Sequence, residues 1–181
     1  MVRDNVATFG RLDIAFNNAG IQNVLAEIAD ATVEDFDRVN SVNLSGVWGC
    51  MKYKFQQMRK QSNGVIVNCS SIVGIVGGAE RANYHTAKHG VLGLTKSAAL
   101  EYAARNIRVN AVCTGLIWTP MAEQMAASGQ REALDAMVKS VLMQRHGQAE
   151  EIADVVLWLS SDASSYVTGQ SISVDGGLTM R

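Results

Sequence analysis

Short apolar runs alternate along this chain with longer segments of helical periodicity, and this alternation constrains the fold more strongly than any other feature. The apolar runs have the length and composition of strands. They are residues 12–16, 64–70, 107–113 and 171–177. The segments with a helical pattern are residues 32–61, 83–104, 149–160 and a stretch near 131–142. Strands that alternate with helices predict an α/β fold with a doubly wound parallel sheet.

Composition limits the chain to one globular domain and excludes several classes of function. With 181 residues, 48% hydrophobic and 18% charged, it has the size and composition of a single domain with its own core. The net charge of −1 argues against a nucleic-acid partner, and no apolar run approaches the roughly 20 residues of a membrane span. The three cysteines show neither zinc-ligand nor disulfide spacing, so we expect no metal and a reducing, cytoplasmic environment.

A tyrosine and a lysine, Tyr84 and Lys88, lie four residues apart in one of the helical segments. Residues at this spacing share a helix face, so the ammonium of Lys88 is expected close to the phenol of Tyr84. A free tyrosine has a pKa of about 10, and a neighbouring positive charge lowers that value. The pair therefore predicts a tuned acid/base, although the spacing alone also fits a solvated helix face.

Several polar motifs are expected at the same edge of the sheet as this pair. Ser70 and Ser71 close the second strand, and the segment NNAG at residues 17–20 closes the first. Asn43 lies inside the long helical segment between those two strands. Open parallel sheets bind their ligands at the carboxyl ends of the strands. The motifs are therefore predicted to contribute to one site.

These motifs together resemble those of the short-chain dehydrogenase/reductases. The resemblance rests on NNAG, Asn43, the two serines, the Tyr84 and Lys88 pair, and the segment VTGQSISVDGG at residues 167–177. It extends over essentially the whole chain and implies a Rossmann-like fold. It also implies an NAD(P)-dependent oxidoreductase that interconverts an alcohol and a ketone by hydride transfer. The implied partners are a small-molecule substrate and further copies of the chain.

The resemblance implies a role for each catalytic candidate. Tyr84 matches the general acid/base that exchanges a proton with the substrate oxygen. Lys88 matches the group that lowers the pKa of Tyr84 and binds the nicotinamide ribose. Ser71 matches the hydroxyl that orients and polarises the substrate oxygen. Asn43 matches the side chain that holds a water next to the lysine and so completes a proton relay.

Contacts to NAD or NADP are implied in the same way. The candidates for cofactor binding are Asn18, Ala19, Gly20, Tyr84, Lys88, Ile117 and Thr119. The first three match the element beside the adenosine portion. Ile117 matches the backbone that engages the carboxamide, and Thr119 matches the hydroxyl near the nicotinamide and the phosphates. Residues 17–20 also fit a plain strand-to-turn signal, and Thr119 before Pro120 also fits an ordinary loop residue.

The family's phosphate-binding motif does not occur in this sequence. Members begin with a strand and a T-G-x-x-x-G-x-G turn that cradles the pyrophosphate, whereas NNAG already starts at residue 17 here. The resemblance therefore predicts one incomplete domain over residues 1–181, truncated at its N-terminus, with weak or no activity. The alternative is a non-catalytic member that serves as an oligomerisation or interaction partner, because the family's long helices pair across subunits into dimers and tetramers.

Two histidines, His85 and His89, directly follow the tyrosine and the lysine. An offset of one residue turns a side chain about 100° around a helix. We therefore expect both histidines to contact solvent or another subunit and to take no part in catalysis.

Overall fold

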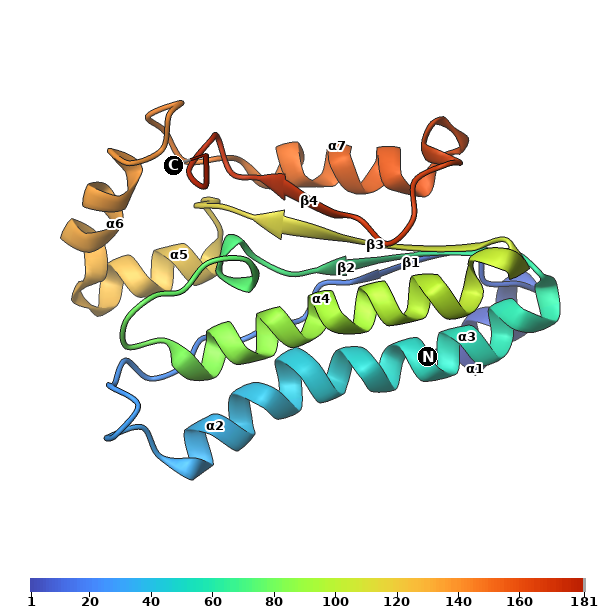
Figure 1. Cartoon of the computed structure of the whole chain (residues 1–181), viewed down its shortest axis with the longest axis horizontal. Coiled ribbons are helices and arrows are strands. Elements are labelled where there is room, and N and C mark those ends of the chain that lie inside the picture. Colours follow the sequence, from blue (N-terminus) through green and yellow to red (C-terminus); the bar gives the residue numbers. More distant parts are fainter. Residues whose placement is uncertain (181) are drawn as a thin grey trace.

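The computed structural model describes residues 1–180 of the chain and has a parallel sheet at its centre (Figure 1). The strands are β1 (Ile14–Asn17), β2 (Gly64–Cys69), β3 (Ile107–Thr114) and β4 (Ser171–Val174). They pair in this order, all parallel, with β1 and β4 at the edges. All four predicted strands are present. The last ends at Val174 because Gly176 and Gly177 adopt left-handed φ angles of 61° and 84°.

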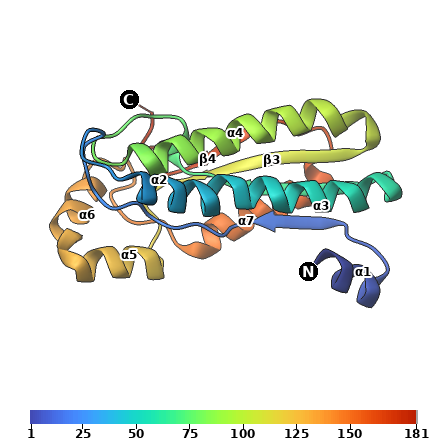
Figure 2. The ribbon, with the colours of Figure 1, turned by 90° about the horizontal axis from the view of Figure 1, so that it is seen from below.

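Helices cover both faces of the sheet, as a doubly wound fold requires (Figures 1 and 2). The first face carries α2 (Val33–Asn40), the π-helical turn η1 (Ser41–Ser45), α3 (Gly46–Gln61) and α4 (Ala82–Tyr102), which the short η3 (Ala103–Arg105) follows. The second face carries α7 (Ala149–Ser160), which the short η5 (Asp162–Ser164) follows. These elements confirm the three long helical segments predicted from the sequence. Thr32 caps α2, because its hydroxyl accepts a hydrogen bond from Asp35 N at 3.1 Å.

The remaining helices lie in the connections. They are α1 (Val2–Phe9), η2 (Ile72–Gly74), α5 (Pro120–Met125), η4 (Ala126–Gln130) and α6 (Arg131–Val138). The helix predicted near residues 131–142 therefore ends at Val138, and a further helix, α5, precedes it. No helix in the described part of the chain has the length and apolarity that crossing a bilayer requires.

The core has two layers because successive side chains of each strand point to opposite faces of the sheet. In β2, Ile66 packs into the cluster beneath α3 and α4, whereas Val67 packs beneath α7. Both side chains are fully buried. Burial on both faces explains why the strands have nearly continuous apolar sequences.

The edge strand β1 is buried on one face only. Ala15 packs into the cluster beneath α3 and α4. Ile14 and Phe16 point to the other face, where α7 packs over β2 and β3, and they remain 51% and 37% exposed. Strand β1 is therefore more apolar than its burial among the described residues requires.

Candidate active site

Lys88 is held against the carboxyl end of β2 by two hydrogen bonds. Its ammonium donates to the carbonyl oxygen of Cys69, the last residue of β2, at 2.9 Å. Its own carbonyl accepts from the hydroxyl of Ser70 at 2.9 Å. The close approach is possible because residue 74 is glycine, since a Cβ there would lie 2.9 Å from the Lys88 carbonyl oxygen. The Lys88 side chain is 3% exposed. Helix α4 is therefore fixed to the strand at the residue predicted to assist catalysis.

Ser71 and Tyr84 meet above this strand end. The Ser71 hydroxyl lies near enough to the Tyr84 phenol to lower its pKa. The Ser71 hydroxyl also lies 3.3 Å from the carbonyl oxygen of Thr114, at the end of β3. The Lys88 ammonium lies 5.6 Å from the centre of the Tyr84 ring. The structure thus brings the predicted serine, tyrosine and lysine together at one edge of the sheet.

The pKa of Tyr84 shifts in the direction opposite to the one expected. Burial raises the pKa of this phenol well above its ordinary value, and the neighbouring Cys69 raises it further. Arg81 and the Ser71 hydroxyl lower the pKa by a smaller amount. The net shift is therefore upward, because burial outweighs the groups that lower the pKa, and a lowering of this pKa by Lys88 stays a prediction.

Asn43 contacts the backbone of the loop that follows β1. Its side-chain amide donates to the Ile21 carbonyl and its side-chain oxygen accepts from the Ile21 amide, both at 2.8 Å. Asn43 is fully buried and lies in the π-helical turn η1, a distortion that is frequent at functional sites. Both side-chain polar atoms are therefore engaged with Ile21, and the predicted contact to a water beside Lys88 stays a prediction.

Gly20 completes the group around the lysine. A Cβ at this position would lie 3.4 Å from the Asn43 side-chain oxygen and 3.6 Å from the Lys88 ammonium. Asn18 and Ala19, the other two residues matched to the adenosine side, are exposed just beyond the end of β1. The structure therefore places Gly20 against the catalytic candidates and leaves its two neighbours open to solvent.

The two cofactor candidates after β3 lie in an ordered loop. The amide of Trp118 donates to the Gly147 carbonyl and the amide of Gly147 donates to the Leu116 carbonyl, each at 2.9 Å. In such a parallel bridge the backbone groups of the middle residue, Ile117, point to the opposite side. Thr119 is the N-cap of α5, with its hydroxyl 3.4 Å from the Ala122 amide. Its hydroxyl therefore has a structural role in addition to the one predicted.

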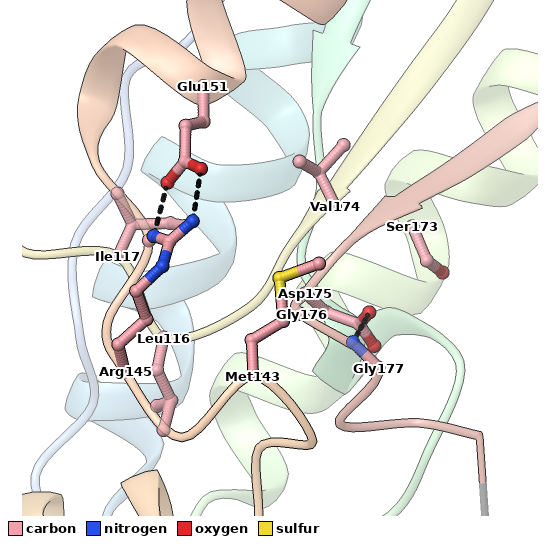
Figure 3. Close-up of a pocket in the computed structure, with 11 residues that line it drawn as sticks. Leu116, Ile117, Met143, Arg145, Glu151, Ser173, Val174, Asp175, Gly176 and Gly177 are labelled. Atoms are coloured by element: carbon pink, nitrogen blue, oxygen red, sulfur yellow. Dashed lines mark hydrogen bonds and ion pairs between the residues drawn. The ribbon is translucent and has the colours of Figure 1, made fainter.

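A cavity of about 310 Å³ lies between this loop, the segment before α7 and the end of β4 (Figure 3). Ile117 and Val174 line it, together with a bidentate ion pair in which Arg145 lies 2.7 Å from Glu151. Asp175 lines it as well, and its carboxylate accepts a hydrogen bond from the Gly177 amide at 3.0 Å. The charged groups drawn there already have partners, and the predicted catalytic residues do not line this cavity. The cavity is therefore separate from the predicted catalytic residues.

Sequence reasoning missed a buried carboxylate that organises the entrance to the site. Asp35 accepts a hydrogen bond from Asn83 at 2.9 Å, forms an ion pair with Arg38 at 2.6 Å, and accepts from the Val24 amide at 3.3 Å. Burial alone would raise its pKa, but these partners hold the pKa of Asp35 below its ordinary value. The acid thereby ties α2, the loop after β1 and the first turn of α4 together. From the sequence, an acid in the first turn of α2 indicated only a favourable interaction with the helix dipole.

A second missed feature is a buried polar chain beneath the sheet. The Lys54 ammonium donates to the Asn17 side-chain oxygen. Asn17 donates to Asn68 at 2.7 Å, and Asn68 donates to Thr95 at 2.9 Å. Burial lowers the pKa of Lys54. The first asparagine of NNAG therefore connects α3, β2 and α4, which no local sequence pattern could reveal.

The expectation that His85 contacts solvent is wrong. Its side chain is 8% exposed, and Nδ1 lies 3.0 Å from the Val76 carbonyl oxygen. The segment after η2 folds over the helix and covers this face, so the helical angle alone did not predict the environment. His89, one turn later, is exposed as expected.

Comparisons with known proteins agree with this geometry. A family profile described as Enoyl-(Acyl carrier protein) reductase matches residues 1–179. Over 180 residues the chain is 46% identical to the 3-oxoacyl-[acyl-carrier-protein] reductase FabG of Thermotoga maritima, covering 99% of this chain and 71% of that protein. The chain belongs to the short-chain dehydrogenase/reductase family.

Two solved structures support the same assignment. ElxO with NADP bound matches with a TM-score of 0.92 and 35% identity, over 99% of this chain and 72% of that one. NAD⁺-bound xylitol dehydrogenase matches with a TM-score of 0.92 and 35% identity, over 97% of this chain and 72% of that one. The fold is therefore the Rossmann-like fold of this family, and the chain spans about 70% of the length of these relatives.

Proposed function

We propose that this chain interconverts an alcohol and a ketone as an NAD(P)-dependent oxidoreductase, with Tyr84 as the general acid/base. The observation that carries the proposal is that Ser71 and Lys88 both lie beside Tyr84: the Lys88 ammonium is 5.6 Å from the centre of the phenol ring, and the Ser71 hydroxyl is near enough to lower the pKa of the phenol. These three groups lie at the carboxyl edge of a parallel sheet, where this fold binds its ligands.

Each side chain has a distinct task in this proposal. The raised pKa of Tyr84 keeps its phenol protonated at neutral pH, so Tyr84 donates that proton to the oxygen of a ketone. Ser71 donates a hydrogen bond to the same oxygen and stabilises the charge that develops there. Lys88, fixed to Cys69, holds its positive charge beside the phenol as it loses the proton. The arrangement supports reduction at neutral pH.

The residues around Lys88 fit a nicotinamide cofactor. An ammonium has three donors, of which the described residues engage one at Cys69, and Gly20 leaves room beside it. Lys88 and Tyr84 would bind the ribose, and the Ile117 backbone the carboxamide. When bound, the nicotinamide supplies the hydride. Solved relatives bind NADP in one case and NAD⁺ in another, so both cofactors remain candidates.

We expect the 181-residue polypeptide alone to bind dinucleotide weakly, because its sequence has no glycine-rich pyrophosphate cradle. Calorimetry with NADPH and NADH measures this directly, and micromolar affinity with turnover would refute it. The function itself is tested by fusing the chain behind the N-terminal segment of the Thermotoga maritima reductase and assaying a panel of ketones. Cofactor-dependent reduction supports the proposal, and a folded fusion without turnover contradicts it.

The second candidate function, an oligomerisation partner, is favoured by one observation. Large apolar side chains are exposed on helices α3 and α4, among them Trp48 and Tyr53 on α3 and Leu100 on α4. We propose that these helices pair with a second copy of the chain as a homodimer or homotetramer. Light scattering of the purified chain gives its mass, and a monomer at all concentrations would exclude this role.

A further inference from the structure

A second cation, Arg81, lies beside the catalytic candidates and is bound only by neutral groups among the described residues. It precedes Tyr84 by three residues, at the start of α4. One terminal guanidinium nitrogen donates to the Gln22 side-chain oxygen and the other to the Gln130 side-chain oxygen, both at 3.0 Å. Gln22 lies two residues after NNAG, and Gln130 ends η4. The arginine therefore lies where three segments meet over the site.

Arg81 forms no ion pair among the described residues, and the carboxylate of the adjacent Glu80 acts on it only from a longer distance. Within residues 1–180, no carboxylate lies within 4.0 Å of its guanidinium, whereas Arg38, Arg131 and Arg145 each have one. Its side chain is partly buried. A partly buried guanidinium loses water contacts that neutral amides only partly replace, so an anion placed there gains a strong interaction.

The same charge reaches the reacting group. Arg81 and Tyr84 lie three residues apart at the start of α4, and the guanidinium lowers the pKa that burial of the phenol raises. A carbonyl oxygen placed between Ser71 and Tyr84 would therefore bring the neighbouring atoms of the substrate close to the guanidinium. A carboxylate on those atoms matches the forked donors of arginine in shape and in charge.

We propose that Arg81 is a specificity residue that binds a carboxylate of the substrate, so that the site favours oxo acids and hydroxy acids over neutral ketones and alcohols. This inference rests on the proposed function, because it takes the substrate oxygen to lie between Ser71 and Tyr84. The carboxylate replaces the Gln22 and Gln130 side-chain oxygens as the acceptor. Gln130 follows Gly129, whose φ of 90° marks a kink in η4, so this partner can move away without disturbing α4.

The test measures binding and requires no cofactor. Lactate, 3-hydroxybutyrate and 4-hydroxyvalerate are titrated into the 181-residue chain, each against its uncharged amide, by calorimetry or by NMR shifts. The series covers the unknown spacing between the hydroxyl and the carboxylate. We expect at least one acid to bind about tenfold more tightly than its amide. Equal affinities for all three pairs would overturn the proposal.

Variants assign the preference to the residue. In Arg81→Gln, the affinities for the acid and for its amide should differ by no more than about twofold. Arg81→Lys keeps a positive charge but lacks the two parallel donors of a guanidinium, so it should restore part of the difference in affinity. The matched control is Arg131→Gln, whose exposed guanidinium lies beside Gln130 in sequence and pairs with Asp135 at 3.2 Å. A preference that survives Arg81→Gln, or disappears in the control, contradicts the assignment. Failure of the fusion to reduce ketones would refute the proposed function and leave this preference measurable.

Discussion

Asn43 forms hydrogen bonds with both backbone polar groups of Ile21. These two bonds fix the position of the loop after β1 relative to the candidate site. The two hydrogen bonds, each 2.8 Å long, join the π-helical turn η1 to the residue that follows NNAG. Gly20 is thereby held next to the Lys88 ammonium. The asparagine thus acts on the lysine's surroundings through the backbone of a neighbouring loop.

Replacing Asn43 with alanine should destabilise the fold by about 1–3 kcal/mol, because the Ile21 amide and carbonyl lose their partners. Urea unfolding followed by circular dichroism measures this difference. The control is Asn40→Ala, one turn earlier, where an exposed side chain bonds only the Phe36 carbonyl. That change should stay within about 0.5 kcal/mol. Equal effects of the two variants would show that the Ile21 contact has no special weight.

Tyr84→Phe in the fusion protein should lower turnover by about 10²–10⁴-fold, because the phenol is the proposed proton donor. The ring remains, so cofactor affinity measured by calorimetry should change by less than about twofold. Tyr53→Phe, which removes an exposed hydroxyl on α3, should leave turnover unchanged. Reduction at the original rate without the Tyr84 hydroxyl would exclude its role as the acid.

Gly74→Ala should destabilise the protein by about 1–3 kcal/mol through overpacking. The new Cβ would lie 2.6 Å from the Ser70 hydroxyl oxygen and 2.9 Å from the Lys88 carbonyl oxygen, and the latter belongs to a rigid helix. Gly77→Ala is the matched control, since a Cβ there meets nothing within 4 Å. Chemical denaturation of both variants gives the comparison. A stable Gly74→Ala protein would mean that η2 and α4 separate easily.

Stability should fall between about pH 6.5 and pH 5 because of His85. Burial lowers the pKa of His85, although the Val76 carbonyl raises it in part. The folded state therefore binds a proton less readily than the unfolded state, whose histidine pKa is about 6.5. The stabilising contribution is complete above that pH and is lost as the pH falls. The carboxyl pKa values of Asp35 and Asp175 are lowered, so these two groups change the stability only nearer pH 4.

The measurement is the urea midpoint at pH 7.5 and at pH 5. His85→Gln should flatten the difference between the two. His89→Gln, at an exposed position on the same helix, should reduce it only slightly, because the charge of His89 is a minor cause of the lowered His85 pKa. A pH dependence that is identical in His85→Gln and the unchanged chain would assign it to other groups.

Local patterns in the sequence were sufficient to predict the sheet and most helices. Helix α7 begins and ends as predicted, because Glu151 at its third position accepts from the Gln148 amide at 2.8 Å and closes a capping box. The strands were predicted because burial on both faces leaves a continuous apolar sequence. Helix α5 was missed, although Thr119 as N-cap and Pro120 at the first position are ordinary start signals.

The site shows where sequence reasoning fails. The spacing of Tyr84 and Lys88 correctly predicted that they lie together, but it carried no information on how deeply the phenol is buried, and burial decides the pKa. The buried Lys54 was missed because its partner Asn17 lies 37 residues away in the chain. Arg81 attracted no attention, because its acceptors come from segments that meet only in the folded protein.

The two hydrogen bonds of Lys88, to Cys69 and from Ser70, limit which parts of the chain can move relative to each other. Strand β2 and helix α4 are coupled through Cys69 and Ser70 at the residue beside the phenol, so they move as one body. The segment from α5 to α6 has no comparable bond to that body in the described residues beyond side-chain contacts from Gln22 and Arg81. Under the proposed function, substitutions in that segment would change which compounds bind and would leave the arrangement of Tyr84 and Lys88 unaltered.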